Sequence, residues 1–130
     1  MRIIFYIAIV VICLGVLHDC DAESQELTAS YYSVASCKRE GTWQRWGGLM
    51  ANGKQFKDEN KTAASWDYAF GKKLRVTNTR NGKSVVVEVT DRGPNKKLYR
   101  KGRVIDLSIS SFAAIANIKE GIIPVRIEEV

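Results

Sequence analysis

The feature that most constrains this chain is a pair of alternating apolar runs joined by a tight-turn signal, within Lys72–Thr90. In the first run Leu74 and Val76 alternate with polar residues, and in the second run every other residue is a valine on one face, as expected for a strand with one buried face. The pair Asn81–Gly82 between the runs favours a two-residue hairpin turn in which both residues adopt positive φ. The segment therefore predicts a β-hairpin. The residues of the apolar faces are Leu74, Val76, Val85, Val87 and Val89.

Short segments with strand character recur along the rest of the chain. Two stretches containing glycine or proline among charged residues, Ala35–Gly48 and Asp91–Gly102, are expected to be loops. One helix is expected over Ser108–Asn117, with an apolar face at helical spacing: Ile109, Phe112, Ala113 and Ala116. Several short strands and one short helix predict a compact, mainly β barrel. The other predicted strands are Leu27–Val34, Thr62–Trp66 (a strand or a turn), Arg103–Leu107 and Val125–Glu128.

The N-terminal segment has a different composition. Arg2 precedes the apolar run Ile3–Leu17, and small residues precede Glu23, which is the pattern of a cleaved secretory signal peptide. An uncleaved membrane anchor is the alternative, but the run is shorter than the ~20 residues that a spanning helix needs. A lipid anchor at Cys20 is disfavoured because Asp19 directly precedes it. We expect a signal peptide over residues 1–22, one domain over residues 23–130, and a secreted or periplasmic product.

The net charge and the cysteine content of the chain argue against some classes of function. The chain carries a formal net charge of +6, and loss of residues 1–22 would raise it by one. A cationic exported protein favours anionic cell-wall polymers and makes nucleic acid an improbable partner. After residue 22 the sequence contains one cysteine, Cys37, and no histidine, because the one histidine of the chain, His18, lies in the predicted signal peptide. No internal disulfide and no catalytic Cys–His pair is therefore expected.

A series of short motifs resembles the rare lipoprotein A family in both order and spacing. The resemblance runs from Thr28 to Val130 and implies a six-stranded double-psi β-barrel with one or two short helices. It also implies an endolytic lytic transglycosylase that cuts peptidoglycan glycan strands without a metal or cofactor, and we expect a monomer. The matching stretches are Ala29–Tyr32, Met50–Gly53, Thr62–Ala64, Phe70–Gly71, Leu74–Asn78, Asn81–Val87, Thr90–Pro94, Arg103–Ser108 and Pro124–Ile127.

Two aspartates are the catalytic candidates, and Asp91 is preferred. In a lytic transglycosylase the 6-hydroxyl of the sugar attacks its own anomeric carbon, so one acid can protonate the leaving oxygen and accept the hydroxyl proton. Asp91 ends a predicted strand, and the resemblance places the family's catalytic aspartate in this motif. Asp106 is the second candidate, since a nearby carboxylate would raise one pKa. The alternatives are a turn role for Asp91 and a buried structural role for Asp106.

The chain departs from the family pattern at two groove positions. Lys54 stands where enzymatic members usually have glutamate, and Ser65 where they usually have histidine. Aromatic side chains are candidates to stack on sugars, and of the neighbours Tyr31 and Tyr32 only Tyr32 is expected to face the groove. The predicted substrate-binding residues are Tyr32, Asn52, Lys54, Ser65, Trp66 and Arg92. Further aromatic candidates are Trp43, Trp46 and Tyr68.

Three functions remain open on these residues. The first is a lytic transglycosylase that uses Asp91. The second is a non-catalytic, expansin-like module that binds peptidoglycan, motivated by Lys54 and Ser65. The third is a protein-binding barrel such as a protease inhibitor, because one fold can host several functions.

Overall fold

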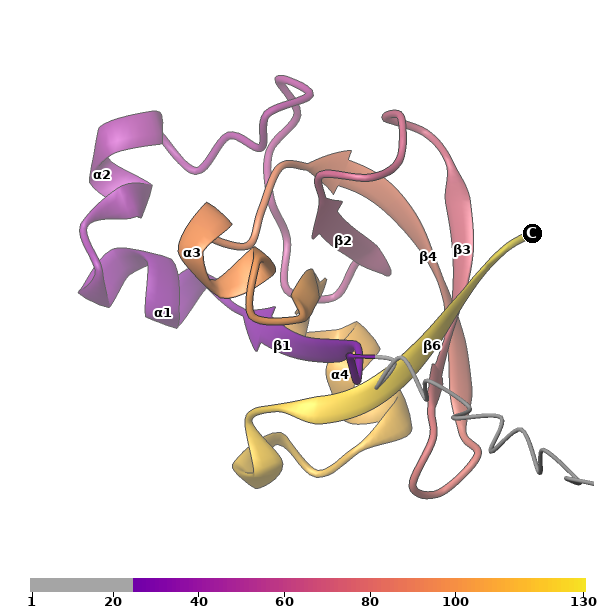
Figure 1. Ribbon diagram of the computed structural model, residues 1–130. Helices are drawn as coiled ribbons and strands as arrows, with labels where there is room; N and C mark the ends of the chain where they lie inside the picture. The colour runs from indigo at the N-terminus through magenta and orange to yellow at the C-terminus, as the bar shows by residue number, and fades with distance from the viewer. Residues whose placement is uncertain (1–24) are drawn as a thin grey trace, which may run out of the picture.

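A computed structural model of the chain describes residues 25–130 as a closed six-stranded barrel (Figure 1). The predicted signal peptide, its cleavage site and Cys20 lie outside the described residues. The strands follow one another around the barrel in the order β1-β5-β2-β4-β3-β6. This closed architecture confirms the predicted mainly β barrel. The strands are β1 (Thr28–Tyr32), β2 (Thr62–Ser65), β3 (Lys73–Asn78), β4 (Ser84–Asp91), β5 (Arg103–Ser108) and β6 (Ile123–Glu129).

The barrel is mixed, and its parallel pairs join strands that are distant in the sequence. β1 pairs in parallel with β5, and β2 pairs in parallel with β4. The antiparallel pair of β2 and β5 joins these two units, while β3 pairs with both β4 and β6. Each end of the barrel therefore collects loops from several separate parts of the chain.

Alternating residues of the strands fill the barrel interior. Leu74, Val76, Val87 and Val89 of the predicted hairpin are all almost fully buried, and Val85 packs partly against the same cluster. Burial of such side chains contributes about 1.5–3 kcal/mol each, so this core is the main source of stability. The other buried members include Ala29, Ala63, Ile105, Leu107, Phe112, Ile115 and Ile123.

The hairpin itself is confirmed, but its predicted turn is wrong. Register holds to the pair Thr77 and Ser84, and Asn78 N–H then donates to Lys83 O at 2.8 Å. The loop therefore has four residues, 79–82, and only Gly82 has positive φ, at +74°. Asn81 instead accepts a hydrogen bond from Lys83 N–H through Oδ1 at 2.9 Å, which stabilises the longer loop.

Two segments predicted as loops contain short helices. The range 35–48 contains most of α1 (Val34–Arg39) and all of α2 (Thr42–Trp46), and the range 91–102 contains α3 (Lys96–Tyr99). Hydrogen bonds from Ser36 N–H to Ser33 Oγ and from Lys97 N–H to Asn95 Oδ1 cap α1 and α3. The prediction failed because helices of four to six residues show too little apolar periodicity to be seen against glycines and charges.

The predicted C-terminal helix is confirmed as α4 (Ile109–Ile115), followed by the single 3₁₀ turn η1 (Ile118–Glu120). Ser108 caps α4 by accepting from Ser111 N–H. The buried face is made by Ser111, Phe112 and Ile115, whereas Ala113 is exposed, so the expected apolar face was rotated by about one residue.

The helices separate into two groups around the barrel. Figure 1 shows α1, α2 and α3 together on one side, while α4 packs against β4, β5 and β1. Within residues 25–130, no helix has the length and apolar character needed to cross a membrane.

Candidate active site

A β-bulge near the end of β4 decides where Asp91 points. Val89 pairs with Ala63, but Asp91 pairs with the next residue of β2, Ala64, so the register skips Thr90. Val85, Val87 and Val89 alternate towards the barrel interior, and continued alternation would have turned Asp91 inwards as well. Because a bulge shifts the following side chain to the other face, Asp91 lies outside the core.

The two predicted catalytic carboxylates lie in one row across the outer surface. Ser30 of β1 pairs with Asp106 of β5, Asp106 pairs with Ala64 of β2, and Ala64 pairs with Asp91 of β4. The two aspartates are thus two strand spacings apart, roughly 10 Å between Cα atoms. Ala64 between them is small, and a Cβ placed on Gly93 would lie 3.4 Å from its Cβ. The turn after β4 therefore crosses directly over this row.

Asp91 is oriented by backbone hydrogen bonds. Its Oδ1 accepts from Ala51 N–H at 2.9 Å and from Arg92 N–H at 2.8 Å. The backbone adds a hydrogen bond from Asn52 N–H to Thr90 O at 3.2 Å. The Asp91 carboxylate thus stabilises the neighbouring turn, which is the structural role that the sequence offered as an alternative to catalysis. No hydrogen bond to its Oδ2 is formed by the part of the chain that the structure describes.

Asp106 has a more enclosed environment. Ser30 Oγ donates to its Oδ1, and a Cβ on Gly93 would lie 3.7 Å from its Oδ2. Burial raises the pKa of the Asp106 carboxyl, which favours its protonated form, although Ser30 and the charge of Arg103 act in the opposite direction. Asp106 therefore has a structural contact, and its catalytic role stays a prediction.

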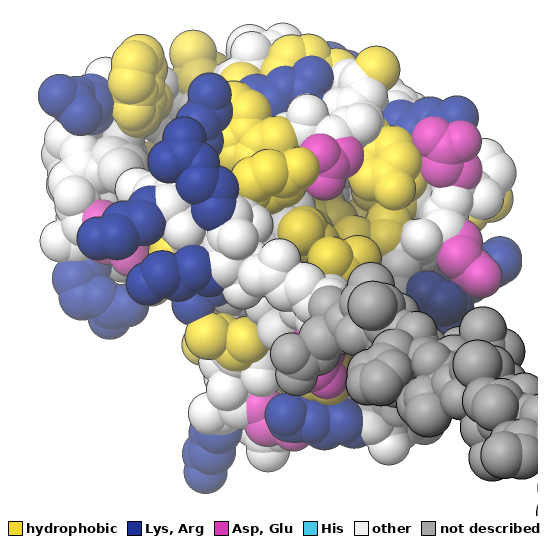
Figure 2. Space-filling model, viewed as in Figure 1, with side chains coloured by type: hydrophobic (Ala, Val, Ile, Leu, Met, Phe, Trp, Pro, Cys, Tyr) yellow, Lys and Arg dark blue, Asp and Glu magenta, His cyan; other side chains and the backbone are white. Residues whose placement is uncertain are grey.

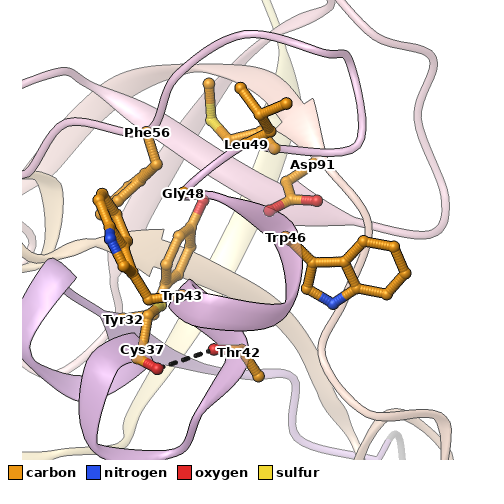
Figure 3. A pocket seen from close by; sticks show the side chains of 10 residues that line it. Tyr32, Cys37, Thr42, Trp43, Trp46, Gly48, Leu49, Phe56 and Asp91 are labelled. Atoms are coloured by element: carbon orange, nitrogen blue, oxygen red, sulfur yellow. Dashed lines mark hydrogen bonds between the residues drawn. The ribbon is translucent and has the colours of Figure 1, made fainter.

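Asp91 borders two hollows on the surface. The smaller, of about 100 Å³, lies between α2 and the turn before β2 (Figure 3). The larger, of about 590 Å³, extends from Trp46 and Leu49 to Ala51, Gly53 and Arg92. Trp46 and Leu49 are 64% and 51% exposed at its edge. An exposed tryptophan beside a carboxylate provides an apolar face and a proton donor or acceptor in one groove.

Tyr31 and Tyr32 have different surroundings, and the binding role of Tyr32 stays a prediction. The Tyr31 ring packs against Phe112 of the core at 4.9 Å between centroids, while the Tyr32 ring packs against Phe56 at 4.6 Å and lines the smaller hollow. The Tyr32 hydroxyl is buried, and burial is the main cause that raises its pKa, with the Asp91 charge second. Tyr32 therefore contributes mainly its ring.

Arg92 lies at the larger hollow, but its guanidinium is anchored. Its Nη1 donates to Ser65 O at 2.8 Å and to Tyr68 O at 2.7 Å, and the group stacks on the Phe70 ring at 3.9 Å. Arg92 thus holds the loop after β2 against the end of β4, and its side chain stabilises the groove wall.

The remaining predicted binding residues, Asn52, Lys54, Ser65 and Trp66, line neither of the two hollows. Lys54 is exposed, and Asn52 Oδ1 accepts from its backbone N–H at 3.0 Å, which closes the turn beside Asp91. Ser65 is 1% exposed, and its Oγ accepts from Asp67 N–H at 3.1 Å. Trp66 is 39% exposed, donates from Nε1 to Pro94 O at 2.6 Å, and has Lys96 Nζ above its ring at 4.9 Å.

Sequence reasoning missed several residues that line the smaller hollow. Gly48, Leu49, Met50 and Phe56 belong to the turn between α2 and β2, and no local pattern marks them as site residues. The only available signal was their position around the Asn-Gly turn at 52–53, which the family resemblance already included.

Basic side chains concentrate near the helices beside the groove. Figure 2 shows Lys and Arg over the side where α1 and α3 lie. Lys38 and Arg39 of α1 and Lys96 and Lys97 of α3 are exposed. The ion pairs formed among the described residues lie elsewhere: Lys72–Glu129, Arg80–Glu120 and Arg126–Glu128. These four basic side chains therefore form no ion pair among the described residues.

A closed six-stranded mixed barrel with two parallel strand pairs has the architecture of a double-psi β-barrel protein, and here Asp91 stands at the end of β4. The chain belongs to the double-psi β-barrel family described as "Lytic transglycolase", which it matches over residues 24–127. This match confirms the fold and the family resemblance derived from the sequence motifs.

Several relatives carry names that describe an activity. A Nostoc sp. protein named "Probable endolytic peptidoglycan transglycosylase RlpA" is 50% identical over 82 residues, which are 63% of this chain and 21% of that protein. The "Endolytic peptidoglycan transglycosylase RlpA" of Vibrio cholerae is 42% identical over 82 residues, which are 63% of this chain and 30% of that protein. The chain therefore spans less than a third of the length of these two relatives.

A solved structure with the same architecture is the Streptomyces papain inhibitor (SPI). It superposes with a TM-score of 0.58 at 20% identity, over 81% of this chain and 92% of that one. At this identity the likeness concerns the fold alone.

Proposed function

We propose that this protein is an endolytic lytic transglycosylase that cuts the glycan strands of peptidoglycan, with Asp91 as its acid and base. The observation that carries the proposal is the outward position of Asp91, held by two backbone N–H groups where two hollows meet. The family and the names of the relatives support the reaction class. The proposal includes an exported domain, residues 23–130, that follows a signal peptide and acts in the cell envelope.

The reaction needs one carboxyl group that changes its protonation state. Protonated Asp91 donates its proton to the leaving glycosidic oxygen as the bond from that oxygen to the anomeric carbon breaks. The 6-hydroxyl oxygen of the same sugar bonds to that carbon and returns its proton to Asp91. Because the nucleophile is part of the substrate, its attack is intramolecular and no water needs to be activated. Atoms and charge balance without a second catalytic carboxylate, which hydrolases ordinarily use.

Other groove residues bind and orient the strand in this proposal. Trp46 and Leu49 contact sugar faces at the exposed edge, while Asn52 shapes the turn from which Lys54 reaches anionic substituents. Arg92 keeps the opposite wall in place through Ser65 O and Tyr68 O. Asp106 is a positioning candidate, because its hydrogen-bonded carboxyl lies in the same strand row as Asp91.

The direct test is digestion of peptide-stripped glycan strands, with anhydro-sugar ends measured by mass spectrometry. The wild-type protein is expected to release these ends, and Asp91→Asn to lower the rate by about 10²–10⁴-fold. Asp67→Asn is a matched control, because Asp67 is an exposed carboxylate outside both hollows. A purified wild-type protein that forms no anhydro ends, beside an active related enzyme, would contradict the proposal.

A second candidate function is peptidoglycan binding without cleavage. It is favoured by Ser65, which occupies the position of the usual family histidine but is 1% exposed and bonded to Asp67 N–H. In that case the protein is retained on insoluble peptidoglycan and releases no product. A stable complex with a protein and no retention on the wall would instead support the protein-binding alternative.

A further inference from the structure

The smaller hollow beside Asp91 has an apolar lining that the cleavage reaction does not use. We call it the Trp43 pocket, and the six side chains used in the argument are Tyr32, Trp43, Trp46, Leu49, Met50 and Phe56. Figure 3 shows Asp91 at one end of this group, with Trp46 near it and pointing outwards. The nearby Thr42 hydroxyl is engaged, because it donates to Cys37 O at 3.1 Å. The lining is therefore mainly apolar, although the buried Tyr32 hydroxyl has no hydrogen-bond partner among the described residues.

The volume of the Trp43 pocket limits what can enter. At about 100 Å³ it has room for roughly three or four non-hydrogen atoms, since a water molecule occupies about 30 Å³. A sugar ring is much larger and has to stay in the wider groove that also borders Asp91. The pocket is thus suited to a substituent on a sugar whose ring lies over Asp91.

The chemistry of the lining selects among the substituents of a peptidoglycan strand. A lactyl carboxylate would be desolvated against apolar walls and repelled by Asp91, and no Lys or Arg lines the pocket. A hydroxymethyl group would leave most of the apolar surface unfilled. An acetamido group has four non-hydrogen atoms outside the ring. Its methyl end can pack against Tyr32, Trp43 and Phe56, while its amide N–H and C=O stay at the mouth of the pocket, where the wider groove leaves them in contact with solvent.

We propose that the Trp43 pocket binds the 2-acetamido group of a sugar held at Asp91, so that the protein selects N-acetylated glycans over chains with a 2-hydroxyl. This inference rests on the proposed action on peptidoglycan strands and adds the group that the site recognises. Its consequence is that affinity depends on N-acetylation even when nothing is cut.

The backbone keeps the wall of the pocket close. Gly48 has φ of +72°, and a Cβ placed there would lie 2.6 Å from Trp43 Cη2 and 2.4 Å from Gln55 Nε2. Gly47 has a similar φ of +62°, but a Cβ there would meet nothing within 4 Å. The two glycines therefore form a matched pair. A side chain at either position has the same kind of backbone strain, because φ is positive at both. Only a side chain at Gly48 also displaces Trp43.

The first experiment compares β-1,4-linked chito- and cello-oligosaccharides of equal length by titration calorimetry. The acetylated chains are expected to bind about ten- to a hundredfold more tightly, which is the range for a small apolar group in a fitted pocket. De-N-acetylated chains are expected to bind less tightly than acetylated chains, even though their ammonium groups are attracted to the Asp91 carboxylate. Equal affinity for acetylated and cello-oligosaccharides, or no binding to either, would overturn the inference.

The second experiment measures the same affinity ratio in variants whose folding is checked by circular dichroism. Trp43→Ala and Gly48→Ala are expected to bring the ratio close to one, whereas Gly47→Ala keeps it. A wild-type ratio in both Trp43→Ala and Gly48→Ala would overturn the inference. A preference for N-acetyl groups without anhydro products would reject only the proposed cleavage. Cleavage with equal affinity for both chains would reject only the acetamido pocket.

Discussion

The barrel and the α1–α2 segment build the same groove by different means. The strands of the barrel bury alternate side chains, and Ala29, Leu74, Ile105 and Leu107 have no exposed surface. Neither α1 nor α2 contains a fully buried residue. Hydrogen bonds help to hold these helices in place, such as the one from Val34 N–H to Asp58 Oδ1 at 2.8 Å, which ties the start of α1 to the segment before β2.

This difference separates stability from recognition. The barrel determines where Asp91 and Asp106 lie, because their positions follow from strand register. The α1–α2 segment supplies Trp43 and Trp46, which line the groove at little cost to the core. We therefore expect substitutions in the barrel to change the free energy of unfolding, and substitutions in the α1–α2 segment to change mainly the affinity for glycans.

The largest effect is expected in the barrel core. Phe112→Ala removes a fully buried ring that also contacts Tyr31, and should lower the free energy of unfolding by about 3–5 kcal/mol. Urea denaturation followed by circular dichroism measures this change. Trp46→Ala, at a 64% exposed position, is the comparison and should stay within about 0.5 kcal/mol of wild type. Similar losses in both variants would remove the distinction between the two regions.

An intermediate effect is expected where the barrel holds a loop of the groove. Arg92→Met deletes the hydrogen bonds to Ser65 O and Tyr68 O and should cost about 1–3 kcal/mol of unfolding free energy. Arg80→Met, which removes an exposed ion pair with Glu120, provides the control and should change little. Equal stability of the two variants would show that the loop after β2 needs no anchor.

A smaller effect is expected at the start of α1. Ser33 Oγ accepts from Ser36 N–H at 3.1 Å, so Ser33→Ala should cost about 1 kcal/mol. Ser33→Asp keeps a capping oxygen and should restore most of this stability. Thermal unfolding of the three proteins provides the measurement. If the alanine variant lost as much stability as Phe112→Ala, the α1–α2 segment would belong to the core in energetic terms.

The smallest effect concerns pH. Burial raises the folded-state pKa of Asp106 above its unfolded value of about 3.9, so ionisation of this carboxyl costs folded-state stability. Its contribution is most favourable below the unfolded pKa and is lost as pH rises through the folded pKa. Asp106→Asn removes this titration and still accepts from Ser30. The stability of the variant relative to wild type should therefore increase as the pH rises above about 4, as measured by urea denaturation. A pH-independent difference would contradict the raised pKa.

Much of the fold was predictable because local patterns and tertiary packing agree. The alternation around Leu74 and Val87 predicted the β3–β4 hairpin, and the spacing around Phe112 predicted α4. The short helices α1, α2 and α3 were not predicted, since each depends on a capping side chain or a glycine rather than on a long apolar face.

The candidate site likewise has one part that the sequence predicts and another that only the fold determines. The motif around Asp91 marked a catalytic candidate, but residue alternation alone would have turned that carboxylate into the barrel. Only the pairing of Asp91 with Ala64 across the bulge at Thr90 directs it outwards, and this register belongs to two strands far apart in the chain. The Trp43 pocket likewise combines β1, α2 and the turn before β2.

The sequence by itself determined the strands, the family motifs and the two carboxylates, because alternation and turn chemistry act between near neighbours. Tertiary structure alone decided the direction of Asp91, the enclosure of Asp106 and the shape of the Trp43 pocket. These properties depend on which distant segments pair when the barrel closes. The register of that pairing is not determined by residues that are neighbours in the sequence.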